Sequence, residues 1–194
     1  MSSSFDIRVI LIFLNSYILF SSTPQKSDPF DRFIDVVKYY LSGWHIRPKG
    51  AKKPYNPVLG EIFRCKWKCH DDTESFYVSE QVSHHPPTSA YFYANPNNGV
   101  VAVGNFSPKP KFLGNSIVSV MNGETRIYFM NYPSEEYILT YPNIYARGLL
   151  FGTTFLEIGD DSTIKCATLD LVAEINFKVK VIIIIYFTNY IVEI

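Results

Sequence analysis

The sequence predicts a mainly β protein in which a large antiparallel meander curls into a barrel or a deep half-barrel, preceded by one amphipathic helix. From about residue 76 onward, short apolar runs of strand length alternate with turn residues, and almost no helical pattern separates them. The chain also contains 14 Tyr and 15 Phe, and aromatic residues of this abundance favour broad β-surfaces or an apolar cavity over a helical bundle. A length of 194 residues suits one domain with one sizeable core.

The strands are predicted from runs that combine β-branched and aromatic residues. Clusters of Gly, Pro, Asn, Asp and Ser separate these runs and supply positive φ or the fixed φ of proline. Among these clusters, Asn122-Gly123 and Gly159-Asp160 are the clearest candidates for hairpin turns. The predicted strands cover residues 76–82, 89–93, 100–106, 111–120, 125–130, 135–141, 147–158, 163–171 and 173–179.

A helix is predicted over Ser27–Ser42. Asp28 can cap its first turn, Pro29 suits the first helical position, and Gly43 is expected to end it. Its apolar positions recur at helical spacing, while its other face mixes acidic and basic residues. A membrane-surface helix would carry a basic polar face, so we expect this helix to pack on the core.

Charge and cysteine content exclude some classes of protein. The chain has 18 Lys and Arg against 18 Asp and Glu, so no global field attracts nucleic acid, and any anion site must be local. The three cysteines, Cys65, Cys69 and Cys166, form no disulfide framework and indicate a reducing compartment. We assign them no functional role.

The two ends differ from the middle. Ile7–Phe20 is apolar and is followed by small residues, which loosely imitates a secretory signal, but the run is short for a membrane span of about 20 residues. Val181–Ile194 is likewise apolar and β-branched. A secreted or membrane-anchored protein is therefore an alternative that depends on the first run alone.

A basic, proline-rich loop follows the helix at Arg47–Gly60. Three prolines stiffen this loop, so Lys53 and Asn56 project from a rigid backbone. Rigid cationic and amide donors suit recognition of a fixed anion such as a phosphate monoester, whereas an arbitrary basic run is usually a solvated linker.

His84 and His85 stand directly before Pro86 and Pro87, at the end of a predicted strand. Metal binding is disfavoured because neighbours on an extended chain point to opposite faces. Catalysis is disfavoured because no nucleophile motif accompanies the pair. As phosphate ligands, two imidazoles at a stiff strand end can both donate N–H groups. We therefore expect a binding site without turnover, no enzyme activity, no metal and no cofactor.

Two motifs resemble the oxysterol-binding protein family. These are KKPYNPVLGEIF at Lys52–Phe63 and EQVSHHPP at Glu80–Pro87, and the stretches Asp28–His45 and Tyr145–Asp160 extend the resemblance. It implies a large antiparallel, nearly closed barrel whose apolar tunnel takes a sterol or other lipid and whose mouth binds the headgroup of phosphatidylinositol 4-phosphate. By position, it implies that Lys53 and Asn56 contact the phosphoinositide and that His84 and His85 grip the 4-phosphate. It assigns no sterol-binding residue.

The resemblance covers residues 27–180, leaving an apolar leader at 1–26 and an apolar tail at 181–194 that do not match. Family members continue with a lid before the helix and further segments after the strands, so we expect a large antiparallel, incomplete β-barrel with an N-terminal amphipathic helix. We hypothesise that both ends are translated non-coding sequence or a truncated gene model, which transcript sequencing would test.

The resemblance implies a cytosolic lipid-transfer protein, peripheral on intracellular membranes, that exchanges a sterol for phosphatidylinositol 4-phosphate and binds no nucleic acid. Alternatives are a phosphatidylserine carrier, a non-transferring lipid sensor or tether, and an inactive truncated fragment.

Overall fold

The computed structural model describes residues 22–44, 56–69, 71–178, 182–187 and 190–193, with side chains up to residue 178. One α-helix, α3 (Pro29–Trp44), follows a short 3-10 helix, η1 (Thr23–Gln25), and a second 3-10 turn, η2 (Ala167–Leu169), interrupts the strands within these ranges. The strands are β1 (Ile62–Lys68), β2 (Glu74–Ser83), β3 (Thr88–Asn95), β4 (Val100–Phe112), β5 (Ser116–Asn122), β6 (Glu124–Phe129), β7 (Glu136–Thr140), β8 (Asn143–Arg147), β9 (Phe155–Cys166), β10 (Leu171–Lys178), β11 (Ile182–Phe187) and β12 (Tyr190–Glu193).

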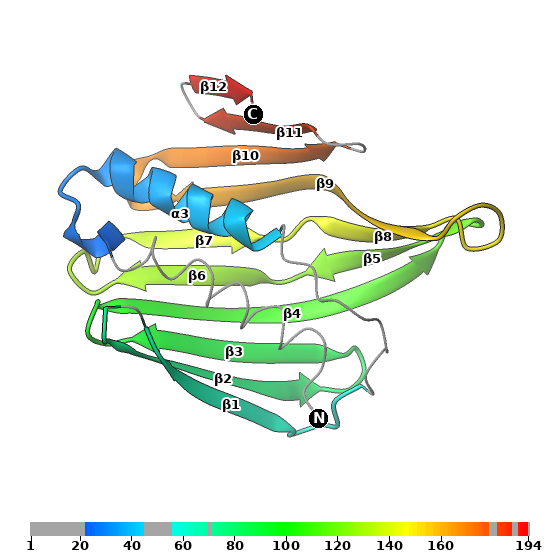
Figure 1. The fold of residues 1–194 in the computed structure, drawn as a ribbon, viewed down its shortest axis with the longest axis horizontal. Helices are drawn as coiled ribbons and strands as arrows, with labels where there is room; N and C mark the ends of the chain where they lie inside the picture. Colours follow the sequence, from blue (N-terminus) through cyan, green and yellow to red (C-terminus); the bar gives the residue numbers. More distant parts are fainter. Residues whose placement is uncertain (1–21, 45–55, 70, 179–181, 188–189, 194) are drawn as a thin grey trace.

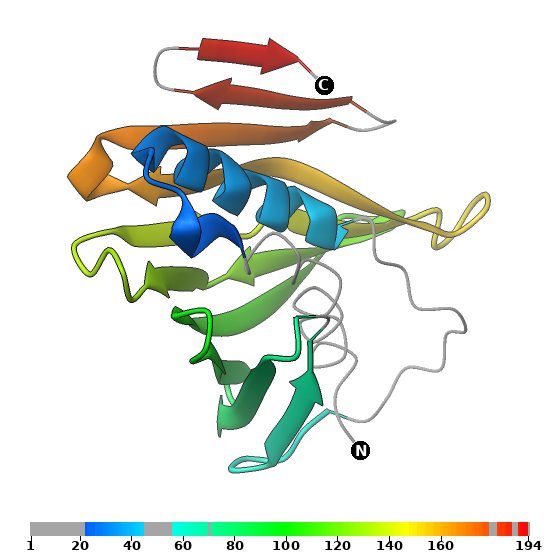
Figure 2. The same ribbon diagram turned by 60° about the vertical axis from the view of Figure 1, so that its left-hand side comes forward.

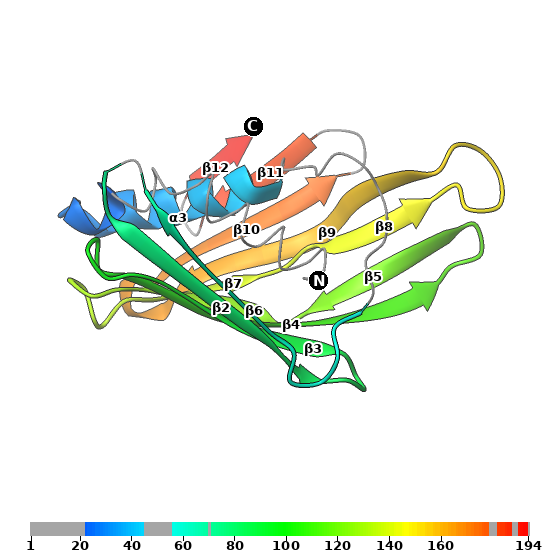
Figure 3. The same cartoon turned by 60° about the horizontal axis from the view of Figure 1, so that its bottom comes forward.

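All described strands belong to one antiparallel sheet, which confirms the predicted fold class. Its order is β1-β2-β3-β4-β5-β8-β9-β10-β11-β12, and β6 and β7 lie between β4 and β9. β1 and β12 are the two edges and do not pair with each other. The sheet curves into a trough, with α3 lying across its concave face (Figures 1, 2 and 3). The barrel is therefore incomplete over the described residues.

Two pairs of short strands act as two long, interrupted strands. β5 and β6 both pair with β4 in one continuous register, since Ser107 lies opposite Asn122 and Gly104 opposite Thr125. β7 and β8 both pair with β9, but with a shift of one residue between them, since Leu139 lies opposite Ile164 and Asn143 opposite Gly159. The sheet therefore keeps its order across these breaks.

The two predicted hairpins are wrong. Gly123 has a φ of +123° at the junction between β5 and β6, which do not pair with each other. Asp160 has a φ of +69° inside β9, at the point where β9 passes from pairing with β8 to pairing with β10. Positive φ residues serve bulges and bends in long strands as well as turns, and here they reshape strands that continue.

Some predicted strands were also misplaced. The run 147–158 divides into the end of β8, a loop and the start of β9, and Leu113–Asn115 forms the connection between β4 and β5. The run 163–171 contains the η2 turn. β1 was missed, although Phe63, Cys65 and Trp67 alternate there with charged residues as in a half-buried strand.

The helix is confirmed with its predicted start. The amide N–H of Phe30 donates to Oδ1 of Asp28 at 2.8 Å, so Asp28 satisfies one of the unpaired donors of the first turn. Gly43, expected to end the helix, is instead a buried residue within it, and the helix ends one residue later, at Trp44. The apolar side chains Phe33, Val36 and Val37 are buried in the core cluster, so the helix packs on the sheet as predicted.

No helix within the described ranges is both long enough and apolar enough to cross a lipid bilayer.

Candidate functional site

The His84–His85 pair lies in the turn between β2 and β3. Both side chains are exposed, and their ring centroids are 4.6 Å apart with the planes tilted by 59°. The two imidazoles are therefore neighbours and not directed to opposite sides, as an extended backbone would have placed them, because the chain turns at this point.

Ser107 of β4 supports this turn. Its hydroxyl donates to the carbonyl of Pro87 at 3.1 Å, and the hydroxyl of Thr88 donates to Ser107 Oγ at 3.1 Å. These bonds connect the histidine turn to a strand that is not adjacent to β2. Two strands therefore fix the position of the turn.

The end of the basic loop lies beside β2. The N–H of Gly60 donates to the carbonyl of Gln81 at 2.8 Å, and the N–H of Gln81 donates to the carbonyl of Glu61 at 3.1 Å. The structure therefore places the second half of one sequence motif against the other, three residues before His84. Asn56 is exposed just ahead of this turn, and Lys53 lies outside the described residues.

Gln81 and Ser89 complete the frame behind the pair. The Gln81 side chain is buried and donates from Nε2 to the carbonyl of Ser83 at 2.7 Å, while Ser89 Oγ donates to Gln81 Oε1 at 2.6 Å. Sequence reasoning missed Gln81, Ser89 and Ser107. Gln81 alternates with the exposed Glu80 and Val82, but the partners of all three residues depend on strand register.

The imidazoles are available to bind an anion. Within the part of the chain that the structure describes, neither histidine side chain forms an ion pair, and no carboxylate contacts them. Likewise, no three His, Cys, Asp or Glu side chains gather as metal ligands among the residues described. The turn presents two neighbouring imidazoles that can donate N–H hydrogen bonds, and such a pair of donors suits a phosphate group.

The histidine turn and two other connections lie at the same side of the sheet, where strands of one direction end. β2, β4 and β8 run in the same direction, because one antiparallel strand separates each from the next. The carboxyl ends of these three strands therefore lie on the same side of the sheet (Figure 1). The turn after β2 carries the histidines, and the connections after β4 and β8 project from that same side of the sheet.

The concave face is aromatic and buried. Tyr77, Tyr91 and Tyr93 alternate with exposed residues on β2 and β3, and Tyr39 of α3 belongs to the same core cluster. Burial raises the pKa of the Tyr39 and Tyr91 phenols, the first well above its ordinary value. These side chains are therefore neutral and line an apolar interior with a few hydroxyl groups.

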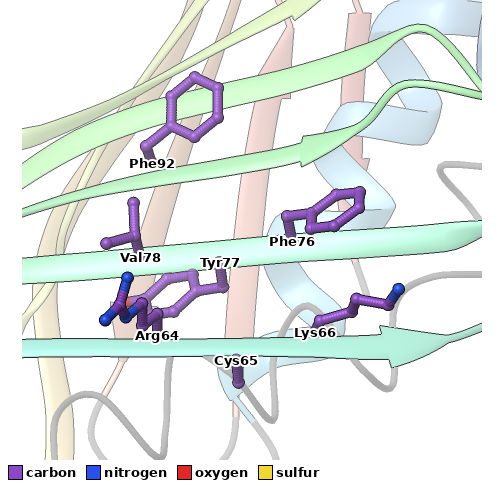
Figure 4. A pocket seen from close by; sticks show the side chains of 7 residues that line it. All are labelled: Arg64, Cys65, Lys66, Phe76, Tyr77, Val78 and Phe92. Carbon is purple, nitrogen blue, oxygen red and sulfur yellow. The ribbon is translucent and has the colours of Figure 1, made fainter.

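A shallow hollow of about 480 Å³ lies on the opposite, convex face of the sheet (Figure 4). Its lining is formed mostly by outward side chains of β1, β2 and β3, such as Arg64, Phe76 and Phe92, together with Cys65 and Tyr77. Tyr77 is only 2% exposed and belongs to the core cluster, so the buried core lies between this hollow and the concave side. It therefore has no part in the histidine site.

The fold and the site define a class of protein: an antiparallel, curved sheet with an aromatic interior and, at the carboxyl end of β2, a supported turn that carries two exposed histidines. A family model for oxysterol-binding protein matches residues 11–190. The chain belongs to the oxysterol-binding protein family.

Relatives of the chain include proteins from fungi and mammals. It is 46% identical over 179 residues to an oxysterol-binding protein homolog of Schizosaccharomyces pombe, an alignment that covers 87% of this chain and 37% of the relative. It is 45% identical over 164 residues to oxysterol-binding protein-related protein 5 of Mus musculus, covering 84% of this chain and 18% of the relative. The chain thus spans little more than a third of the first relative's length.

Solved structures share the fold. The Osh3 ORD from Saccharomyces cerevisiae in complex with PI(4)P has a TM-score of 0.74 at 21% identity, covering 94% of this chain and 49% of that one. The Osh1 ORD domain in complex with ergosterol has a TM-score of 0.77 at 25% identity, covering 93% of this chain and 44% of that one.

Proposed function

We propose that this chain is the lipid-binding core of an intracellular carrier that binds a sterol in its apolar interior and phosphatidylinositol 4-phosphate by its headgroup, and exchanges them between membranes. The observation that carries the proposal is the exposed His84–His85 pair, supported by Ser107 and placed beside the 58–61 turn in a member of this family. Relatives with the same fold have been solved with PI(4)P and with ergosterol, which supports both ligands.

The headgroup site rests on His84, His85, Asn56 and Lys53. Two imidazoles can donate to phosphate oxygens from one side, and the Asn56 amide adds a neutral donor from the adjoining segment. Lys53, carried over by position from the family motif, would supply a permanent cation. Such a set holds a doubly charged phosphate without any bond being made or broken, so the chain acts as a carrier.

The second cargo would occupy the concave side of the sheet. Its aromatic side chains offer apolar contacts, and burial of an apolar ligand is stabilised by about 25 cal/mol per Å². No particular residue is assigned to the sterol.

The test is extraction of labelled phosphatidylinositol 4-phosphate from liposomes by the purified 194-residue chain. We expect extraction by the parent chain and its loss in the His84→Ala/His85→Ala variant, with sterol uptake largely retained. The Lys66→Ala/Lys68→Ala variant removes two cations from the exposed, convex face of β1. It controls for a general effect of lost positive charge on liposome binding. Equal loss of both cargos in the histidine variant would make the pair structural and overturn the headgroup assignment.

Transfer is tested separately with donor and acceptor liposomes. We expect the chain to move labelled sterol to the acceptor faster when the acceptor contains phosphatidylinositol 4-phosphate. Binding without transfer would make the chain a lipid sensor, and the absence of both would make it an inactive fragment.

A further inference from the structure

The connections β4–β5 and β8–β9 form an exposed apolar tip. We define the apolar tip as Phe112, Leu113, Leu149, Leu150 and Phe151. Leu150 and Phe151 are exposed to 63% and 79%, and the other three are exposed as well. Large apolar side chains at this density on a soluble surface mark an interaction site.

The tip is a built structure that spans two hairpins. The side-chain Oδ1 of Asn115 accepts hydrogen bonds from the amides of Leu150 and Phe151 at 2.7 and 3.0 Å, and its Nδ2 donates to the Phe151 carbonyl at 3.2 Å. The amide of Leu149 also donates to the Asn115 carbonyl. One residue of the first hairpin therefore holds the apolar residues of the second in place beside its own.

The surroundings of the tip are basic. Residues 107–117 contain Lys109 and Lys111 and no carboxylate, whereas Arg147, at the base of the second hairpin, is paired with Glu157. Lys109 and Lys111 are exposed, and no ion pair to either is found in the described ranges. On the convex face, by contrast, Lys66 and Lys68 are paired with carboxylates.

The apolar tip projects from the side of the sheet that carries the histidine turn (Figures 1 and 3). Ser107 contacts that turn, and β4 continues from Ser107 to Phe112. Five residues of strand rise about 17 Å, so the apolar tip extends beyond the level of the histidines.

We propose that the apolar tip inserts into the interfacial region of an anionic lipid bilayer, with Lys109 and Lys111 at the level of the headgroups. A convex group of apolar side chains beside unpaired cations matches a soft apolar layer behind a negative surface. A protein partner would have to supply a matching concave surface free of cations. This inference rests on the proposed function, which requires contact with a membrane, and it names the surface that makes that contact.

Vesicle flotation tests docking apart from cargo binding. The vesicles contain phosphatidylcholine and phosphatidylserine, with no phosphoinositide and no sterol. We expect the parent chain to float with them and Leu150→Ser/Phe151→Ser to bind at least about tenfold more weakly, as for the loss of two large side chains from an apolar environment. Met130→Ser/Phe92→Ser is the matched control, since both residues are exposed apolar residues away from the tip.

Insertion itself is tested by fluorescence. We expect emission from Phe151→Trp to shift to shorter wavelength on adding vesicles and to be quenched by brominated acyl chains, whereas Met130→Trp responds to neither. Circular dichroism and size-exclusion chromatography on every variant check the fold and the oligomeric state.

The outcomes separate the two proposals. Equal flotation of the tip variant and the parent, or a change of oligomeric state in place of lost flotation, overturns the membrane assignment while leaving extraction untouched. Docking through the tip without any extraction of phosphatidylinositol 4-phosphate instead overturns the proposed function and leaves the docking surface standing.

Discussion

Arg32 of α3 forms a two-point ion pair with Glu135 in the β6–β7 connection, 103 residues further along the chain. Nε of Arg32 donates to Oε2 of Glu135 at 3.0 Å, and Nη2 donates to Oε1. Both side chains are buried, at 2% and 6% exposure. The Tyr137 hydroxyl donates to Glu135 Oε2 at 2.6 Å, and the guanidinium lies 3.5 Å from the centre of the Tyr132 ring. This network attaches the helix to the sheet.

Arg32→Met is expected to lower the free energy of unfolding by about 3–5 kcal/mol, because it leaves the buried Glu135 carboxylate without its cation. Glu135→Leu alone is expected to cost a similar amount. The double variant is expected to cost much less than the sum, since neither charge then remains buried and unpaired. Urea unfolding of the four proteins measures the coupling, and strictly additive losses would contradict the prediction.

Gly104→Ala should destabilise the sheet. Gly104 lies opposite Tyr91, whose ring crosses it, and an added Cβ would come 2.5 Å from Tyr91 Cζ. Tyr91 cannot retreat easily, because its hydroxyl is hydrogen-bonded to Thr125. We expect a loss of about 1–3 kcal/mol in chemical denaturation, the usual range for overpacking.

Gly159→Ala is the matched control for that substitution. The added Cβ would come 3.1 Å from the ring of Tyr145, so this half-buried ring, whose hydroxyl donates to Asp160, must move much less than the ring of Tyr91. We expect a change below about 1 kcal/mol. If Gly159→Ala cost as much as Gly104→Ala, the effect would come from the backbone and not from the Tyr91 ring.

Alkaline pH should destabilise the fold. Burial raises the pKa of Tyr39, Tyr91 and Tyr141 above the ordinary 10.0. The unfolded chain then releases these protons at lower pH than the folded one, so stability is full below about pH 10 and falls above it by up to about 1.4 kcal/mol per pH unit for each such tyrosine. Urea unfolding at pH 8, 10 and 11 measures the slope. Ionisation of all 14 tyrosines near pH 10 while circular dichroism stayed native would contradict this prediction.

Local patterns predicted the helix, its Asp28 cap and most strands, because these depend on neighbours in the sequence. The acidic and basic residues of the predicted polar face of the helix include Arg32 and Asp35, yet both are buried. Their partners come from other segments: Glu135 for Arg32, and Lys26 with Thr23 for Asp35. A periodicity argument places a charged residue on a solvated face and cannot anticipate a partner 103 residues away.

The candidate site likewise combines residues that local motifs predict with residues that only the strand pairing reveals. The resemblance of two motifs named His84, His85, Asn56 and Lys53, whereas the side chains that frame the turn, Gln81, Ser89 and Ser107, follow from strand register. The apolar pattern over 147–158 predicts a strand, whereas the structure has an exposed loop between β8 and β9, so the sequence pattern does not reveal the apolar tip.

Asn115→Ala should weaken membrane docking without unfolding the protein. Asn115 is exposed, so its three side-chain hydrogen bonds to Leu150 and Phe151 add little to global stability, and we expect a change below about 1 kcal/mol. Their loss frees the loop, which must then be ordered again when it inserts, and partition into phosphatidylserine vesicles should fall several-fold. Flotation measures that fall, and amide hydrogen exchange at Leu150 and Phe151 measures the loosening. Asn98→Ala, which removes a comparable side-chain bridge to Asp71 at the opposite edge, should leave flotation unchanged. Equal flotation of the two variants would show that the order of the tip does not contribute to docking.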